Sequence, residues 1–154
     1  MTEKEFKEIC LCGETTRVQF KREFTTQKEM AKEMIAFANS RGGIILFGVE
    51  DKTGELVGLS YDQLQQTSRE LGNTAQEQVR PTIYIETDVV KVDEKHFLVC
   101  TIADGRNKPY KNLQGEIWVK LLSKRVKLLP KSEKLLPKRK ILLPKSVKVL
   151  PKRI

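Results

Sequence analysis

A proline recurs every seven residues near the carboxyl end of this 154-residue chain, at positions 130, 137, 144 and 151. Each proline removes a helical hydrogen bond and clashes with the preceding turn, at a cost of about 3 kcal/mol, so the seven-residue period cannot form a continuous helix or coiled coil. An extended basic chain and short unstable turns are the remaining choices. We therefore expect residues 121–154 to be a tail without a stable fold.

The positive charge of the chain is concentrated in the same segment. Residues 120–154 carry 13 Lys and Arg against one Glu, a net charge of +12, whereas the first 119 residues carry 16 basic and 19 acidic side chains, a net charge of −3. A flexible segment with that charge would attract any nucleic acid or anionic membrane without specificity. The overall charge therefore does not indicate whether the folded part binds nucleic acid.

The first 120 residues have the composition of a single domain whose cysteines are reduced thiols. They contain no apolar run of the roughly eighteen residues that a membrane span needs, and the amino-terminal segment has no apolar stretch typical of a signal peptide. Cys10, Cys12 and Cys100 are an odd number of thiols and suggest no disulfide framework. We expect a cytoplasmic protein without a membrane partner.

Hydrophobic periodicity predicts the first elements. Residues 16–23 alternate between apolar and polar side chains, which indicates a half-buried strand. Thr26 and Glu29 form the pattern of a capping box, and an apolar stripe at helical spacing follows as far as Arg41. A similar capping pattern predicts a short helix within residues 1–13.

The apolar run at 44–50 has no polar face and predicts a central strand that is covered on both sides. A polar helix over 61–78, a hairpin from 83–89 to 96–102 and a last strand at 117–120 complete the pattern. This order predicts an α+β (layered α/β) fold with a mixed β-sheet and two to three helices. The expected organisation is an N-terminal helix at 1–13, a domain at 14–120 and the repeat tail at 121–154.

Three separated strings resemble one family. They are ETTRVQFKRE (14–23), IAFANSRGGIILFGVEDKTGELVGL (35–59) and NKPYKNLQGEIWVK (107–120). Together they resemble the Schlafen AlbA-type (AlbA_2) domain over residues 14 to about 120. The resemblance implies that fold and a nucleic-acid-binding module, with DNA favoured over RNA, that acts as a transcriptional regulator and as a homodimer.

The same family includes nucleases that cleave RNA, and their metal-binding acids fall on Glu14, Gln19 and Asp51. Gln19 departs from the pattern, because a neutral amide brings no negative charge to hold Mg²⁺ or Mn²⁺. Without the resemblance, the three residues would be a loop carboxylate, an exposed strand position and the first residue of a β-turn. We expect binding without catalysis and without a cofactor. The alternatives are a degenerate nuclease that uses Mg²⁺ or Mn²⁺, and an inactive truncated interaction domain.

Cations in three separate segments are the candidate binding residues, with one aromatic ring and one amide among them. They could supply phosphate contacts around a stacking ring if the sheet brings their loops together, and otherwise they are ordinary solvated side chains. The predicted nucleic-acid-binding residues are Lys21, Arg22, Asn39, Arg41, Arg106, Lys108, Tyr110 and Lys111.

Overall fold

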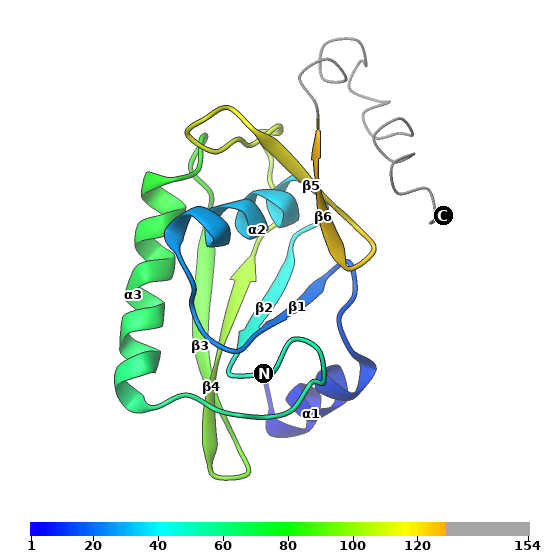
Figure 1. The fold of residues 1–154 in the computed structure, drawn as a ribbon, viewed down its shortest axis with the longest axis vertical. Helices are drawn as coiled ribbons and strands as arrows, with labels where there is room; N and C mark the ends of the chain where they lie inside the picture. Colours follow the sequence, from blue (N-terminus) through cyan, green and yellow to red (C-terminus); the bar gives the residue numbers. More distant parts are fainter. Residues whose placement is uncertain (129–154) are drawn as a thin grey trace.

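The computed structural model describes residues 1–128, which form three helices and six strands (Figure 1). The helices are α1 (Glu3–Cys12), α2 (Gln27–Asn39) and α3 (Tyr61–Glu77), and the strands are β1 (Val18–Lys21), β2 (Gly43–Phe47), β3 (Ile85–Val92), β4 (Lys95–Ile102), β5 (Ile117–Leu121) and β6 (Lys124–Leu128). The predicted α+β class, with a mixed sheet and two to three helices, is confirmed.

The main sheet has the strand order β1-β2-β4-β3. β1 and β2 are parallel and are joined by the crossover helix α2, while β4 runs antiparallel to both β2 and β3. Ile45 on β2 pairs with Gln19 on one side and with Cys100 on the other. The apolar run that predicted a central strand therefore forms an interior strand of the sheet, paired with β1 on one side and with β4 on the other.

Apolar side chains bury both faces of this sheet. On one face, α2 and α3 pack over β2 and β4 through residues such as Met34, Phe37 and Leu71. On the other face, α1 packs through Phe6, whose ring centroid lies 4.8 Å from that of Phe97. In Figure 1, α3 runs alongside β3 and β4, and α1 lies at the end of the molecule that carries the N-terminus.

A second, two-stranded sheet consists of β5 and β6 and packs on α2. The predicted domain boundary at residue 120 falls inside this hairpin, so the domain continues to at least Leu128. The sequence pattern missed β6 because its basic residues resemble those of the repeat that follows. The remainder of the predicted tail, 129–154, lies outside the described residues.

Hydroxyl side chains begin each helix. Thr2 and Ser60 form complete capping boxes with Glu5 and Gln63, in which each side chain bonds to the other residue's backbone N–H. At α2 only half of the predicted box is formed. The Thr26 hydroxyl accepts the backbone N–H of Glu29, but the Glu29 carboxylate turns instead to cations on other elements.

Side chains also occupy the outer edges of the main sheet. A carboxylate oxygen of Glu14 accepts the backbone N–H of Phe20 on β1, and Asp88 accepts that of Val89 on β3. Polar groups of this kind disfavour the addition of another strand to the edge of a sheet. Among residues 1–128, no helix is long and apolar enough to cross a membrane.

Candidate nucleic-acid interface

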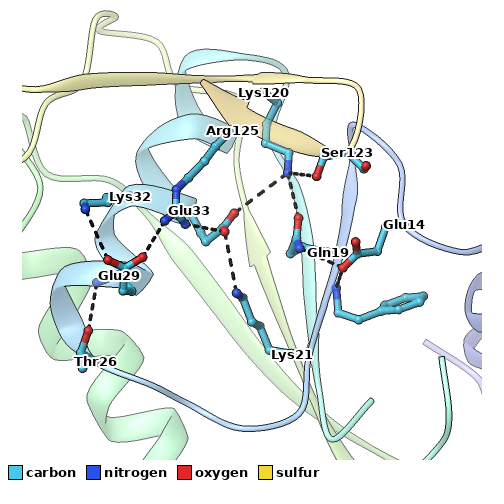
Figure 2. Close-up of polar contacts among 11 residues, drawn as sticks. Glu14, Gln19, Lys21, Thr26, Glu29, Lys32, Glu33, Lys120, Ser123 and Arg125 are labelled. Carbon is cyan, nitrogen blue, oxygen red and sulfur yellow. Dashed lines mark hydrogen bonds and ion pairs between the residues drawn. The ribbon is translucent and has the colours of Figure 1, made fainter. Parts of the chain in front are cut away.

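Two of the three positions at which the resemblance implied metal ligands, Glu14 and Gln19, belong to a closed polar cluster (Figure 2). The Gln19 amide nitrogen donates to the Glu14 carboxylate at 2.8 Å, and the Gln19 amide oxygen accepts from the Lys120 ammonium at 2.9 Å. This arrangement fixes the orientation of the amide, because only its NH₂ group can face a carboxylate and only its oxygen can face an ammonium. Gln19 therefore bridges a negative and a positive side chain.

Lys120 is the buried member of this cluster. Its side chain is 1% exposed, and its ammonium lies over the Phe37 ring, 4.7 Å from the ring centroid. Burial holds the pKa of Lys120 below its usual value, against the opposing effect of the nearby Glu33 and Glu14 carboxylates. The alternation of the last strand does not predict this position, because a lysine in a half-buried strand is normally placed on the solvent face.

Glu14 is a partly buried carboxylate. Burial raises its pKa, the Phe20 backbone N–H opposes that rise, and the negative charge of Asp51 adds to it. Asp51 itself is exposed in the turn that follows β2. Among residues 1–128, no group of three or more His, Cys, Asp or Glu side chains is arranged to hold a metal ion. The residues present do not fit a divalent cation, because Gln19 is neutral and already bonded on both sides, with an ammonium as one partner.

The cluster continues into α2 through a chain of ion pairs. Arg125 on β6 reaches both Glu29 and Glu33, with nitrogen–oxygen distances of 2.6 Å to each carboxylate. Lys21 on β1 approaches the same Glu33 at 3.9 Å. Figure 2 shows these side chains converging from β1, α2 and the β5–β6 hairpin. Their shared role is to hold the hairpin on α2.

Two predicted binding residues have structural roles instead. The Asn39 amide group donates to the backbone carbonyls of Tyr110 and Trp118, and its oxygen accepts the backbone N–H of Tyr110 at 2.7 Å. The Tyr110 side chain is 4% exposed, and its hydroxyl accepts the backbone N–H of Asn107. The expectation of an exposed stacking ring at Tyr110 is wrong, because the ring fills the space above Gly105, where a Cβ atom would overlap it.

The predicted cations are divided between separate places. Lys21 faces Glu33, and Arg22 pairs with Glu50 at 3.4 Å near the far end of β1. Lys111 forms a backbone bridge with Arg80, just beyond α3. These three residues therefore do not join the remaining candidates.

The other three candidates meet at the opposite end of β1, where the segment 40–43 packs against the loop that follows β4. The backbone approach is close, since a Cβ atom at Gly42 would lie 2.6 Å from the carbonyl oxygen of Ile102. The Lys108 ammonium caps this contact by donating to the Ser40 carbonyl at 3.0 Å. Arg41 and Lys108 are thereby brought to one edge of the sheet, and Arg106 lies in the same loop, next to Gly105, whose backbone N–H donates to the Ala38 carbonyl at 2.9 Å. The side chains of all three residues are exposed.

Arg17 joins the same edge. Its carbonyl accepts the Ile44 backbone N–H at 2.9 Å, next to the segment that carries Arg41. Asp104 is the nearby carboxylate. The Lys108 ammonium, 2.9 Å away, together with the charges of Arg17 and Arg41, holds the pKa of Asp104 below its usual value. We call this set of four cations, Arg17, Arg41, Arg106 and Lys108, the basic edge.

Arg17 was not among the predicted binding residues, although its outward position in the alternating strand was a usable signal. The signal was incomplete because the parallel pairing of β1 with β2 brings Arg17 next to the segment that carries Arg41, and that pairing cannot be read from either segment alone. Among residues 1–128, Arg17, Arg41 and Arg106 make no side-chain ion pair within 4.0 Å. Their charges therefore face solvent.

Comparison with known proteins gives one family and two related folds. Residues 14–128 match the family model described as Schlafen, AlbA_2. The N-terminal domain of a RecG-related protein from Nitrosomonas europaea is similar at 24% identity, with a TM-score of 0.58, over 72% of this chain and 79% of that one. The DIP2311 protein from Corynebacterium diphtheriae is similar at 16% identity, with a TM-score of 0.54, over 77% of this chain but only 23% of that one. Both structures share the fold.

Proposed function

The chain belongs to the Schlafen AlbA_2 family, and from this premise we propose that its domain binds nucleic acid through the basic edge. The observation that carries the proposal is the convergence of four exposed cations on one sheet edge, with Asp104 as the carboxylate among them. Arginine and lysine side chains in such a cluster supply the phosphate contacts that dominate nucleic-acid affinity. The unpaired state of the three arginines leaves their donors available to phosphate oxygens.

DNA is the favoured partner, and binding without cleavage is the favoured activity. The similar domain from Nitrosomonas europaea belongs to a protein described as related to an ATP-dependent DNA helicase, which supports DNA. The neutral, doubly bonded Gln19 argues against a metal-dependent nuclease. A module that binds DNA without cutting it is suited to transcriptional regulation. Tyr110 is buried, so we expect the basic edge to contact phosphates and not to stack bases.

A titration of the full chain with fluorescent 20-mers of duplex DNA and RNA, across a salt series, tests the proposal. Because the nine Lys and Arg residues of 129–154 add affinity of their own, the reference protein is a full-length variant in which all nine are glutamine. In that background, replacing Arg17 and Arg41 together by Gln should weaken binding to every sequence. The slope of log affinity against log salt should fall by about one per cation removed.

The matched control replaces Lys4 and Lys52 by Gln, two exposed cations outside the basic edge. It removes the same charge and should leave both affinity and salt slope nearly unchanged. Loss of all binding in the tail-neutralised protein, or equal weakening by the two double variants, would overturn the proposal in favour of an interaction domain with a nonspecific basic tail. Light scattering on the same samples measures whether the bound species is the expected homodimer.

A further inference from the structure

A polar cavity of about 360 Å³ lies between α3 and the loop that connects β1 to α2. This volume is in the range of small-molecule sites, roughly 300–1,000 Å³, and is too large for a single metal ion. The loop contributes Glu23, Phe24 and the hydroxyls that precede α2, while α2 contributes Gln27. The cavity is separate from both the basic edge and the Gln19 cluster, and neither uses its lining residues.

One face of α3 forms the opposite wall. Gln63, Gln66, Thr67 and Glu70 all line the cavity, and their spacing places them on one side of a helix. The adjacent stripe of α3, with Leu64 and Leu71, is buried in the core. A polar face that borders a hollow in the protein has side-chain groups available for a ligand.

Several of these groups have unused hydrogen-bonding capacity. Thr67 is only 4% exposed, yet its hydroxyl has no hydrogen-bond partner among residues 1–128. The hydroxyl is not one of the polar atoms that are closed off from solvent, so a ligand or solvent atom in the cavity can reach it. One carboxylate oxygen of Glu70 accepts from Gln27 at 3.0 Å. The second Glu70 oxygen has no partner in the described part of the chain.

The charge of the lining determines which ligands it can accept. Glu23 and Glu70 are carboxylates, and no Lys or Arg lines the cavity. The positive end of α2 contributes only about half a charge and is already faced by Glu29 in the first turn. Phe24 adds an aromatic ring, and aromatic faces attract cations. An anion such as a phosphate is therefore disfavoured here.

We propose that this cavity binds an organic cation that carries a guanidinium or ammonium group. The cationic group is held between the Glu23 and Glu70 carboxylates, with the Phe24 ring against its apolar part and the Thr67 hydroxyl accepting one of its N–H donors. Such a group occurs in free polyamines and related amines, and also in an arginine side chain presented by a partner. The inference does not depend on nucleic-acid binding.

Titration of the ¹⁵N-labelled full chain, followed by two-dimensional NMR, tests the proposal. The probes are agmatine for a free amine, an end-blocked Gly-Arg-Gly peptide for a partner's arginine, and inorganic phosphate as the opposite charge. We expect agmatine or the peptide to shift the backbone resonances of 23–27 and 63–70 in a saturable manner, and the stronger of the two identifies the source. Phosphate should leave these resonances in place.

Glu70→Gln should weaken binding of the preferred probe by about tenfold or more, since it removes a charge-assisted acceptor. Glu77→Gln is the matched control, because it lies on the same helix, is exposed and is outside the cavity. If Glu70→Gln disturbs the fold, Glu23→Gln in the exposed loop replaces it as the test. The proposal would be overturned if neither cation gave saturable shifts at about 10 mM, on the order of the weakest small-ligand affinities. It would also be overturned if the Glu70 and Glu77 variants had equal effects, or if phosphate bound in the cavity.

Discussion

The ammonium of Lys120 donates to the amide oxygen of Gln19 across a sequence separation of 101 residues, and it does so from a site that is almost closed to water. A buried lysine is stable only if its charge is compensated. Here the compensation comes from the Gln19 oxygen and from the Glu33 carboxylate, 4.0 Å away. Lys120 thus links the β5–β6 hairpin to both β1 and α2, beside the ion pairs of Arg125.

Lys120→Met should destabilise the domain by about 3 kcal/mol, because it leaves Glu33 and Gln19 buried without their cation. Arg125 and Lys21 still face Glu33, which keeps the loss at the lower end of the range for broken buried pairs. Urea unfolding followed by circular dichroism measures the change. Lys124→Met on the neighbouring strand is exposed and should alter stability by no more than about 0.5 kcal/mol. Equal effects of the two variants would show that the Lys120 contacts are unimportant.

Glu14 should make the stability depend on pH in a defined direction. Because burial raises its folded-state pKa above the unfolded value of about 4.3, the folded protein binds more protons than the unfolded protein between these two values. The contribution of Glu14 is therefore fully present below about pH 4.3 and is lost as the pH rises through the folded-state pKa. Unfolding free energies measured from pH 4 to pH 7 should fall more steeply with pH in the native protein than in Glu14→Gln. Parallel curves would contradict this assignment.

Two glycines should respond to alanine in opposite directions. Gly72 lies within α3 with no atom within 4 Å of an added Cβ, so Gly72→Ala should stabilise the protein by roughly 0.5–1 kcal/mol through helix propensity. At Gly105 the same change would drive a methyl group into the Tyr110 ring and the Ala38 carbonyl, and roughly 1–3 kcal/mol should be lost. Thermal unfolding of both variants gives the comparison. A neutral Gly105→Ala would mean that the 103–110 loop is not packed as described.

Thiol chemistry should distinguish the three cysteines. Burial raises the pKa of Cys10 to about 11 and that of Cys100 to about 12, so neither forms much thiolate at pH 8, whereas Cys12 is exposed. With Ellman's reagent at pH 8, one thiol per native chain should react quickly, and all three should react in urea. Cys12→Ser should abolish the fast phase. A fast phase that survives this change would show that α1 opens readily from the sheet.

The fold was largely predictable because its elements have strong local signals. The alternation before Lys21, the apolar run that becomes β2, and the Ser60 cap each depend on residues close together in the chain. Helix and strand periods are local properties, so they can be recognised without knowing which elements pack against the segment. β6 was missed because nothing local distinguishes its basic residues from the repeat that follows.

The candidate site was predicted only in part, because its residues are brought together by contacts between distant segments. Asn39 resembled an exposed polar residue, but its amide nitrogen donates hydrogen bonds to two backbone carbonyls more than seventy residues later in the chain. Glu29 matched the pattern of a capping box, but its carboxylate instead accepts from Arg125, 96 residues away. Arg17 and Arg41 both act on Asp104 only because the pairing of β1 with β2 brings their segments together. Such competition depends on the tertiary fold, which a pattern of residue types does not contain.

The late position of Arg125 and Lys120 in the chain has a consequence for synthesis. Glu33 and Gln19 are made early, but Arg125 follows Glu33 by 92 residues. At roughly 5–20 residues per second, a ribosome needs on the order of 5–20 s to supply that partner. During this interval Glu33 has only the more distant Lys21 as a cationic partner, and the Gln19 amide oxygen has no ammonium to accept from. The nascent domain must therefore wait in an incompletely closed state, in which chaperones or proteases can act on it, until its last hairpin emerges.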